Sequence, residues 1–198
     1  GQVRMGGVDT STVPLSHLRA RTGFVSQGVH LLAASIGDNL VLFDDTIPDE
    51  RVRDALTELG LLDWVESMPN GLDTVLGPAG GGLSAGEGQL IALTRLFLRE
   101  PDLILPDEAS SRVDPATEER VTRAIDRLVR GRTAVVIAHR LSTVERMDEI
   151  LVLDAGRVAE HGSQQELRDT AHSRYARLLA TGANSEVDAA PLDPGAGG

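Results

Sequence analysis

Apolar residues recur at helical spacing along much of this chain. Within residues 52–59 they fall three and four positions apart, so they share one face of a helix that begins near Pro48 and stops at Gly60. A longer helix is expected from Ser84 to about Arg99. Further helical patterns follow Ser35, cover Leu61–Met68, follow Asp114-Pro115, follow Ser163 and include Tyr175 and Leu178.

Shorter apolar runs between these helices predict strands. Gln2–Met5 before a Gly-Gly turn, Gly23–Ser26 and Leu103–Leu105 are of this kind. The run Arg132–Ala138 is the most strand-like, and its apolar character throughout predicts a parallel strand covered on both faces. The last strands, Glu149–Leu153 and Arg157–Ala159, are expected to form a hairpin. Alternating strands and helices predict an α/β fold with a mainly parallel sheet.

Composition narrows the class of protein. The 198 residues suit one domain, and 41 % hydrophobic content is enough for a core. The formal net charge of −11 and the absence of a basic run disfavour nucleic-acid binding. No cysteine is present, which excludes disulfides and thiolate metal sites. The apolar runs are too short to cross a bilayer, and the tail 182–198 is expected to be disordered.

The start of the helix at Ser84 is a candidate phosphate site. Ser84 and Glu87 have capping-box spacing, which alone explains their residue types. Preceding glycines at 80–82 and Gly86 add a second interpretation, because small residues let an anion approach the amides at a helix start. Gly88 inside the helix costs about 1 kcal/mol relative to alanine, and no packing reason is evident in the sequence. Together these features favour the phosphate-binding interpretation.

Polar side chains also follow three predicted strands. Asp107 and Glu108 come after Leu103–Leu105, His139 follows the run ending at Ala138, and Gln27 follows the earlier strand. Each one alone has an ordinary structural explanation, but the carboxyl edge of a parallel sheet is where ligands bind. Asp107 is a candidate Mg²⁺ ligand and Glu108 a candidate for orienting an attacking water. Gln27 is a second candidate Mg²⁺ ligand, and His139 is placed to contact a γ-phosphate.

Asp114 precedes a proline, and a helix cap explains it adequately. The histidines His17, His30, His161 and His172 lack such a placement, and we interpret them as surface or packing residues.

These motifs, in this order, resemble those of ATP-binding cassette (ABC) ATPases. Leu83–Gln89 is similar to the signature motif, with Ala85 and Glu87 where Gly and Gln are commoner. Leu103–Glu108 resembles the Walker B strand and Ser111–Asp114 the D-loop. His139 resembles the switch histidine and Gln27 the Q-loop glutamine.

The likeness extends from Gly1 to about Leu179, and it implies a partial ATPase domain at 1–181 with a helical subdomain at about 35–100. It is greatest to the exporter branch. It implies a P-loop NTPase-like fold, incomplete at the N-terminus.

The resemblance implies a mechanism with ATP and Mg²⁺ as cofactors. Two such domains would sandwich two ATP molecules. Ser84, Gly86, Glu87 and Asp114 would bind the nucleotide, with Ser84, Gly86 and Asp114 acting across the dimer. Within one subunit, Gln27 and Asp107 would hold the metal, and Glu108 and His139 would be catalytic. A transmembrane domain, expected upstream on the same polypeptide, would place the chain at the cytoplasmic face of the cell membrane.

Two departures from the family pattern qualify these expectations. No Gly-x-x-x-x-Gly-Lys-Ser/Thr loop occurs in the sequence, so we expect the chain alone to bind ATP poorly and hydrolyse it negligibly. The chain begins with Gly, and we expect it to be cut at its start, leaving apolar sheet surface uncovered. Pro106, before Asp107, lacks a ladder donor and is expected to weaken the metal site.

Two alternatives remain. One is a non-catalytic partner domain of a heterodimeric transporter, mildly favoured by Pro106 and disfavoured by the intact Glu108 and His139. The other is a soluble ABC ATPase of DNA repair or translation, disfavoured by the acidic charge. The transported substrate stays open, because the sequence contains no membrane-spanning segment that would select it.

Overall fold

The protein is described by a computed structural model that covers residues 1–25, 28–106, 114–138 and 141–180. The chain divides into two compact units, 1–137 and 138–198. The tail 182–198, which the sequence predicts to be disordered, lies outside the described residues. The predicted helical subdomain at about 35–100 falls inside the first unit and stays a prediction.

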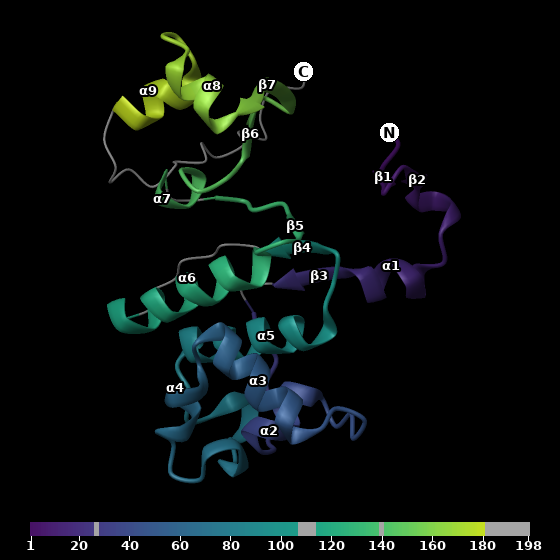
Figure 1. The fold of residues 1–198 in the computed structure, drawn as a ribbon, viewed down its shortest axis with the longest axis vertical. Helices are drawn as coiled ribbons and strands as arrows, with labels where there is room; N and C mark the ends of the chain where they lie inside the picture. The colour runs from purple at the N-terminus through teal and green to yellow at the C-terminus, as the bar shows by residue number, and fades with distance from the viewer. Residues whose placement is uncertain (26–27, 107–113, 139–140, 181–198) are drawn as a thin grey trace, which may run out of the picture. The chain divides into compact units, whose positions relative to one another are not determined.

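The first unit contains a parallel sheet in the order β3-β4-β5 and a separate hairpin of β1 and β2 (Figure 1). Its strands are β1 Arg4–Met5, β2 Val8–Asp9, β3 Thr22–Val25, β4 Leu103–Pro106 and β5 Thr133–Ala134. Its α-helices are α1 Leu15–Arg21, α2 Ile36–Val41, α3 Asp49–Leu59, α4 Leu62–Glu66, α5 Ala85–Arg99 and α6 Pro115–Val129. The mixture of helices with a parallel sheet confirms the predicted α/β class.

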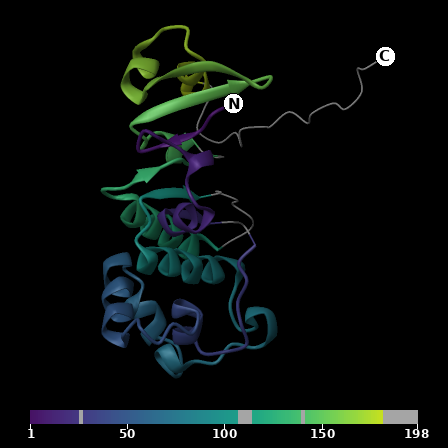
Figure 2. The same cartoon turned by 90° about the vertical axis from the view of Figure 1, so that its right-hand side faces the viewer.

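Helices α5 and α6 pack against one face of this sheet, and α2, α3 and α4 lie beyond α5 (Figures 1 and 2). One apolar cluster runs through these layers, and Ile36, Leu56, Leu90 and Ile104 within it are fully buried. Burial of this face explains why the apolar residues of α3, α5 and α6 recur at helical spacing. The cluster makes α5 the central helix of the first unit.

The strand predicted at Arg132–Ala138 is much shorter in the structure. β5 pairs with β4 only at Thr133 and Ala134, and the register stops before it reaches Pro106. Val135 N–H donates to Ile104 O, so Ile104 faces β5, and Pro106, two residues on, faces the same side. Proline has no N–H to continue the ladder there. The long strand expected from the sequence was wrong for this reason.

The other face of the sheet is largely open in the described part of the chain. Phe24 is 64 % exposed, and Val135 and Ile137 are 57 % and 60 % exposed. The sequence predicted that the 132–138 run would be covered on both faces, and the structure corrects this. The uncovered apolar surface that the sequence analysis also predicted is present here.

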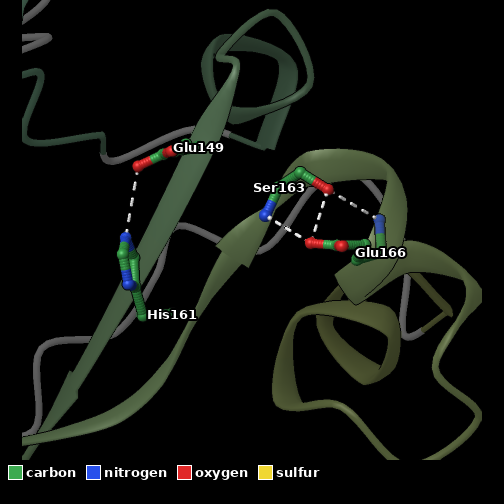
Figure 3. Close-up of polar contacts among 4 residues, drawn as sticks. All are labelled: Glu149, His161, Ser163 and Glu166. Atoms are coloured by element: carbon green, nitrogen blue, oxygen red, sulfur yellow. Dashed lines mark hydrogen bonds and ion pairs between the residues drawn. The ribbon is translucent and has the colours of Figure 1, made fainter.

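The second unit contains an antiparallel hairpin and short helices (Figure 3). Its elements are α7 Leu141–Val144, β6 Glu149–Asp154, β7 Arg157–Ser163, α8 Gln164–Asp169 and α9 Arg174–Ala180. The hairpin and the Ser163–Glu166 capping box confirm two predictions. The His161 Nε2 atom lies 3.2 Å from Glu149 Oε2 on the exposed surface of the hairpin (Figure 3). This placement agrees with the interpretation of His161 as a surface residue.

Candidate functional site

Ser84 caps the N-terminus of α5, as its spacing to Glu87 predicts. The Ser84 hydroxyl accepts a hydrogen bond from the Glu87 N–H at 3.3 Å, and the Glu87 carboxylate accepts one from the Ser84 N–H at 2.8 Å. Among the described residues, no acceptor pairs with the backbone N–H groups of Ala85 and Gly86. Both amides lie at the positive end of a 15-residue helix beside the exposed Ser84, and of these two residues Ala85 is exposed whereas Gly86 is buried.

Glu87 has a second contact that the sequence did not reveal. The indole N–H of Trp64, on α4, donates to Glu87 Oε1 at 3.2 Å. Trp64 is 7 % exposed and belongs to the apolar core of the first unit. The Glu87 side chain thus fixes the start of α5 to α4. No local pattern predicts this pair, since 23 residues separate the two positions.

The glycine-rich lead is mostly explained by packing. A Cβ on Gly80 would lie 2.5 Å from Leu31 Cδ1, and the backbone there has φ +79°. Gly77 and Gly81 exchange backbone hydrogen bonds of 2.9 and 3.2 Å in a tight turn. Of the three glycines at 80–82, only Gly82 has no described atom within 4 Å of the place where a Cβ would lie. Among these three glycines, only Gly82 therefore leaves room for the close approach of an anion that the sequence suggested.

Arg95, near the middle of α5, is a polar residue that the sequence analysis missed. Its guanidinium donates to Asn39 O at 2.5 Å, to Asn39 Oδ1 at 3.0 Å and to His30 O at 2.9 Å. Burial lowers the pKa of Arg95, and an arginine nevertheless keeps its charge in a protein. Asn39 is fully buried and also bonds the backbone of Leu32 in both directions.

This clamp ties the segment that follows Gln27 to α5. The signal in the sequence is the one cation between Leu90 and Leu98, a run whose only other polar residue is Thr94. The sequence alone does not reveal the role of this cation, because its partner Asn39 is 56 residues away along the chain.

Asp114 caps α6, as its position before Pro115 predicts. Its Oδ1 accepts the Thr117 N–H at 3.0 Å. Hydrogen bonding by Thr117, through its side chain and then its backbone, lowers the pKa of Asp114 below its ordinary value. The carboxylate is exposed, so it is ionised and accessible at neutral pH. A role in nucleotide binding stays a prediction.

Several predicted site residues lie outside the described part of the chain: Gln27, Asp107, Glu108 and His139. The strands that lead to two of them are described. Val25 at the end of β3 pairs in register with Pro106 at the end of β4. The chain therefore leaves two neighbouring strands at the same edge of the sheet, directly before Ser26-Gln27 and before Asp107-Glu108.

The start of α5 fits a phosphate group, because the Ser84 hydroxyl and the Ala85 amide are hydrogen-bond donors on exposed residues. The predicted metal ligands Gln27 and Asp107 are outside the described residues. Among the described ones, no group of three His, Cys, Asp or Glu side chains is placed to hold a metal ion. Nor does the described part of the chain contain a helix long and apolar enough to cross a membrane.

Comparison with known proteins identifies relatives over nearly the whole chain. A sequence model of the family "ABC transporter" matches residues 1–111. The mycobactin import ATP-binding/permease protein IrtA of Mycobacterium tuberculosis is 41 % identical over 195 residues, which is 98 % of this chain and 22 % of that protein. The ATP-dependent lipid A-core flippase of Vibrio vulnificus is 38 % identical over 181 residues, 90 % of this chain and 31 % of that protein.

A third relative is the beta-(1→2)glucan export ATP-binding/permease protein NdvA of Agrobacterium vitis, 41 % identical over 181 residues, 91 % of this chain and 31 % of that protein. The chain thus spans between a fifth and a third of the length of these relatives. Matches of this extent confirm the resemblance drawn from the motifs. The chain belongs to the ABC transporter family, as an ATPase domain of the exporter type.

Proposed function

We propose that this chain binds and hydrolyses ATP as part of a transporter, and that it does so as one of two ATPase domains in a dimer. The observation that carries the proposal is the capped start of α5, where the Ser84 hydroxyl and the Ala85 amide belong to exposed residues and can donate to a phosphate. In the proposed dimer, Ser84, Gly86 and Asp114 contact a nucleotide held mainly by the partner domain. Glu87 contributes by fixing the helix start.

In the same proposal, the carboxyl edge of β3 and β4 supplies the catalytic groups. Gln27 and Asp107 hold Mg²⁺, Glu108 orients the attacking water and His139 contacts the γ-phosphate. The paired strand ends at Val25 and Pro106 support this arrangement, because they direct both following segments to one edge. No Gly-x-x-x-x-Gly-Lys-Ser/Thr loop is present in the sequence, so the 198 residues alone are proposed to hydrolyse ATP negligibly.

The fused ATP-binding/permease relatives support a transmembrane domain as the other partner. Such a domain would hold the chain at the cytoplasmic face of the cell membrane. The segment after Gln27, which Arg95 fastens to α5, is the proposed route by which ATP-driven closure reaches it.

Steady-state ATP hydrolysis by the assembled transporter tests the function. Glu108→Gln should lower kcat by about 100-fold or more, since it removes the carboxylate that orients the attacking water, while ATP binding is kept. His139→Ala should also lower kcat, since it removes the proposed contact with the γ-phosphate. Its matched control is His161→Ala, because the His161 side chain lies on an exposed hairpin and bonds only Glu149 among the partners described. Equal turnover in Glu108→Gln and the unaltered transporter would refute the assignment.

A further inference from the structure

The Glu87 carboxylate receives two donors from different parts of the first unit. Its Oε2 accepts the Ser84 backbone N–H at 2.8 Å, and its Oε1 accepts the Trp64 indole N–H at 3.2 Å. Both donors are fixed, because one belongs to the backbone at the start of α5 and the other to a side chain 7 % exposed in the core. The carboxylate therefore satisfies two N–H groups with its two oxygens.

Glutamine would not serve in the same place. An ionised carboxylate only accepts hydrogen bonds, whereas a glutamine amide has one accepting oxygen and one NH₂ group that donates. With Gln at position 87, either Ser84 N–H or Trp64 Nε1–H would face a donor. An indole N–H left buried without an acceptor costs more than an ordinary hydrogen bond is worth. Trp64 thus requires a glutamate at the position where related signature motifs commonly have glutamine.

We propose that Trp64 and Glu87 are a matched donor–acceptor pair, and that Trp64 is a positioning residue for the nucleotide site at the start of α5. The inference rests on the proposed function for its consequence in ATP hydrolysis. Trp64 orients the Glu87 side chain, which holds Ser84 N–H and so sets the direction of the Ser84 hydroxyl and of the Gly86 amide. The core of the first unit, rather than the site itself, thereby determines how these donors face a phosphate.

The pair predicts a specific pattern of coupling. Glu87→Gln should lower the thermal midpoint of the 198-residue chain, because it places an amide donor against one of the two N–H groups. Trp64→Phe should also lower the midpoint, because the smaller ring leaves space in the core, whereas the partly exposed Glu87 can bond water in place of the lost donor. In the Trp64→Phe background the conflict is gone, so Glu87→Gln should lower the midpoint much less there than in the unaltered chain.

Glu66→Gln is the control for removing a charge. Glu66 is also on α4, and its partner is Arg53 at 3.4 Å on the exposed surface. This variant should leave the midpoint and the ATPase kinetics unchanged. Trp64 is the only tryptophan in the sequence, so its fluorescence spectrum reports directly on this contact. The emission of Trp64 should shift in Glu87→Gln and stay constant in Glu66→Gln.

The kinetic arm uses the assembled transporter. Glu87→Gln should lower kcat by about tenfold, which corresponds to about 1.4 kcal/mol, and the same change should lower kcat much less in the Trp64→Phe background. If the losses of thermal midpoint in Glu87→Gln and Trp64→Phe simply add in the double variant, Trp64 and Glu87 are not a matched pair. Coupled stability with additive losses of kcat would overturn the positioning role. Absence of ATP hydrolysis in the unaltered transporter would instead refute the proposed function, while the coupling in the isolated chain would still decide the pair.

Discussion

Replacing Gly88 with alanine should stabilise the first unit, although the residue lies in the segment that resembles a signature motif. A glycine in a helix interior costs about 0.5–1 kcal/mol relative to alanine, because its backbone loses more freedom on folding. Gly88 is buried, yet a Cβ there would lie 3.5 Å from Leu31 Cδ1 and 4.0 Å from Val29 Cβ. Both separations are ordinary contacts, so the new methyl group should fit without displacing its neighbours.

The expected gain in unfolding free energy is therefore about 1 kcal/mol, which raises the thermal midpoint by about 3 °C for a domain of this size. Urea unfolding followed by the fluorescence of Trp64 measures it, because that tryptophan lies in the first unit and does not report on the second. The fitted m value should stay unchanged, so that the shift reflects stability rather than a change in the unfolded state.

Gly60→Ala is the opposite case and serves as the control. Gly60 ends α3 with φ +70°, and a Cβ there would lie 2.2 Å from Arg127 Nη1. That nitrogen already donates to Glu58 O at 3.0 Å, so it has little freedom to move aside. Alanine in this backbone conformation costs about 1 kcal/mol or more. A loss of stability in Gly88→Ala as large as that in Gly60→Ala would refute our interpretation of the packing at Gly88.

Three further changes test other contacts. Arg95→Lys should lower the free energy of unfolding by about 2 kcal/mol, because one ammonium cannot reach both the carbonyl and the side-chain oxygen of Asn39 as the guanidinium fork does. Urea unfolding measures this loss, and the loss in the control Arg99→Lys, on the same helix, should be far smaller. Asp114 has a folded pKa below its ordinary value, so its stabilising charge is fully present above about pH 4 and is lost as the pH falls through the folded pKa. The difference in thermal midpoint between the unaltered chain and Asp114→Asn should stay constant from neutral pH to pH 5 and change only below about pH 4; a change near neutral pH would contradict this. Pro106→Val should raise the midpoint and slow amide exchange in β5, since it supplies the missing ladder donor; unchanged exchange would show that the proline does not end the strand.

Local signals predicted most of the helices correctly. Ser35, Ser84 and Ser163 each begin a helix through a capping box that spans only four residues, so the sequence contains all of the interaction. Helix α1 was missed because it has neither a side-chain cap nor a buried apolar face. Its N-cap, Pro14, makes no side-chain hydrogen bond, and none of its residues is buried. Its stability comes from context that a pattern of apolar positions does not contain.

Non-local features were harder to predict, and β5 is the clearest example. Its own residues have high strand propensity, but its length depends on Pro106 in the neighbouring strand, which is nearly thirty residues earlier in the chain. The same holds for the site. The motifs predicted the cap at Ser84 and the cap at Asp114, but not the contact between Trp64 and Glu87, which joins two helices. The motifs thus predicted which segments form the candidate site, whereas the packing of the helices determines which contacts their side chains make.

Helix α5 joins these findings into one physical argument. Its first turn presents the donors of the candidate phosphate site, and its middle holds the segment after Gln27 through Arg95. Near its end, the Phe97 ring contacts the guanidinium groups of Arg51, from α3, and of Arg132, which precedes β5, whose carbons lie 5.8 and 5.1 Å from the ring centre. Such contacts at the start, middle and end of one helix oppose bending, since each would have to break for part of α5 to move alone. In the proposed function, a phosphate bound at the first turn would act on α5 as one rigid body, and the segment after Gln27 would move with it.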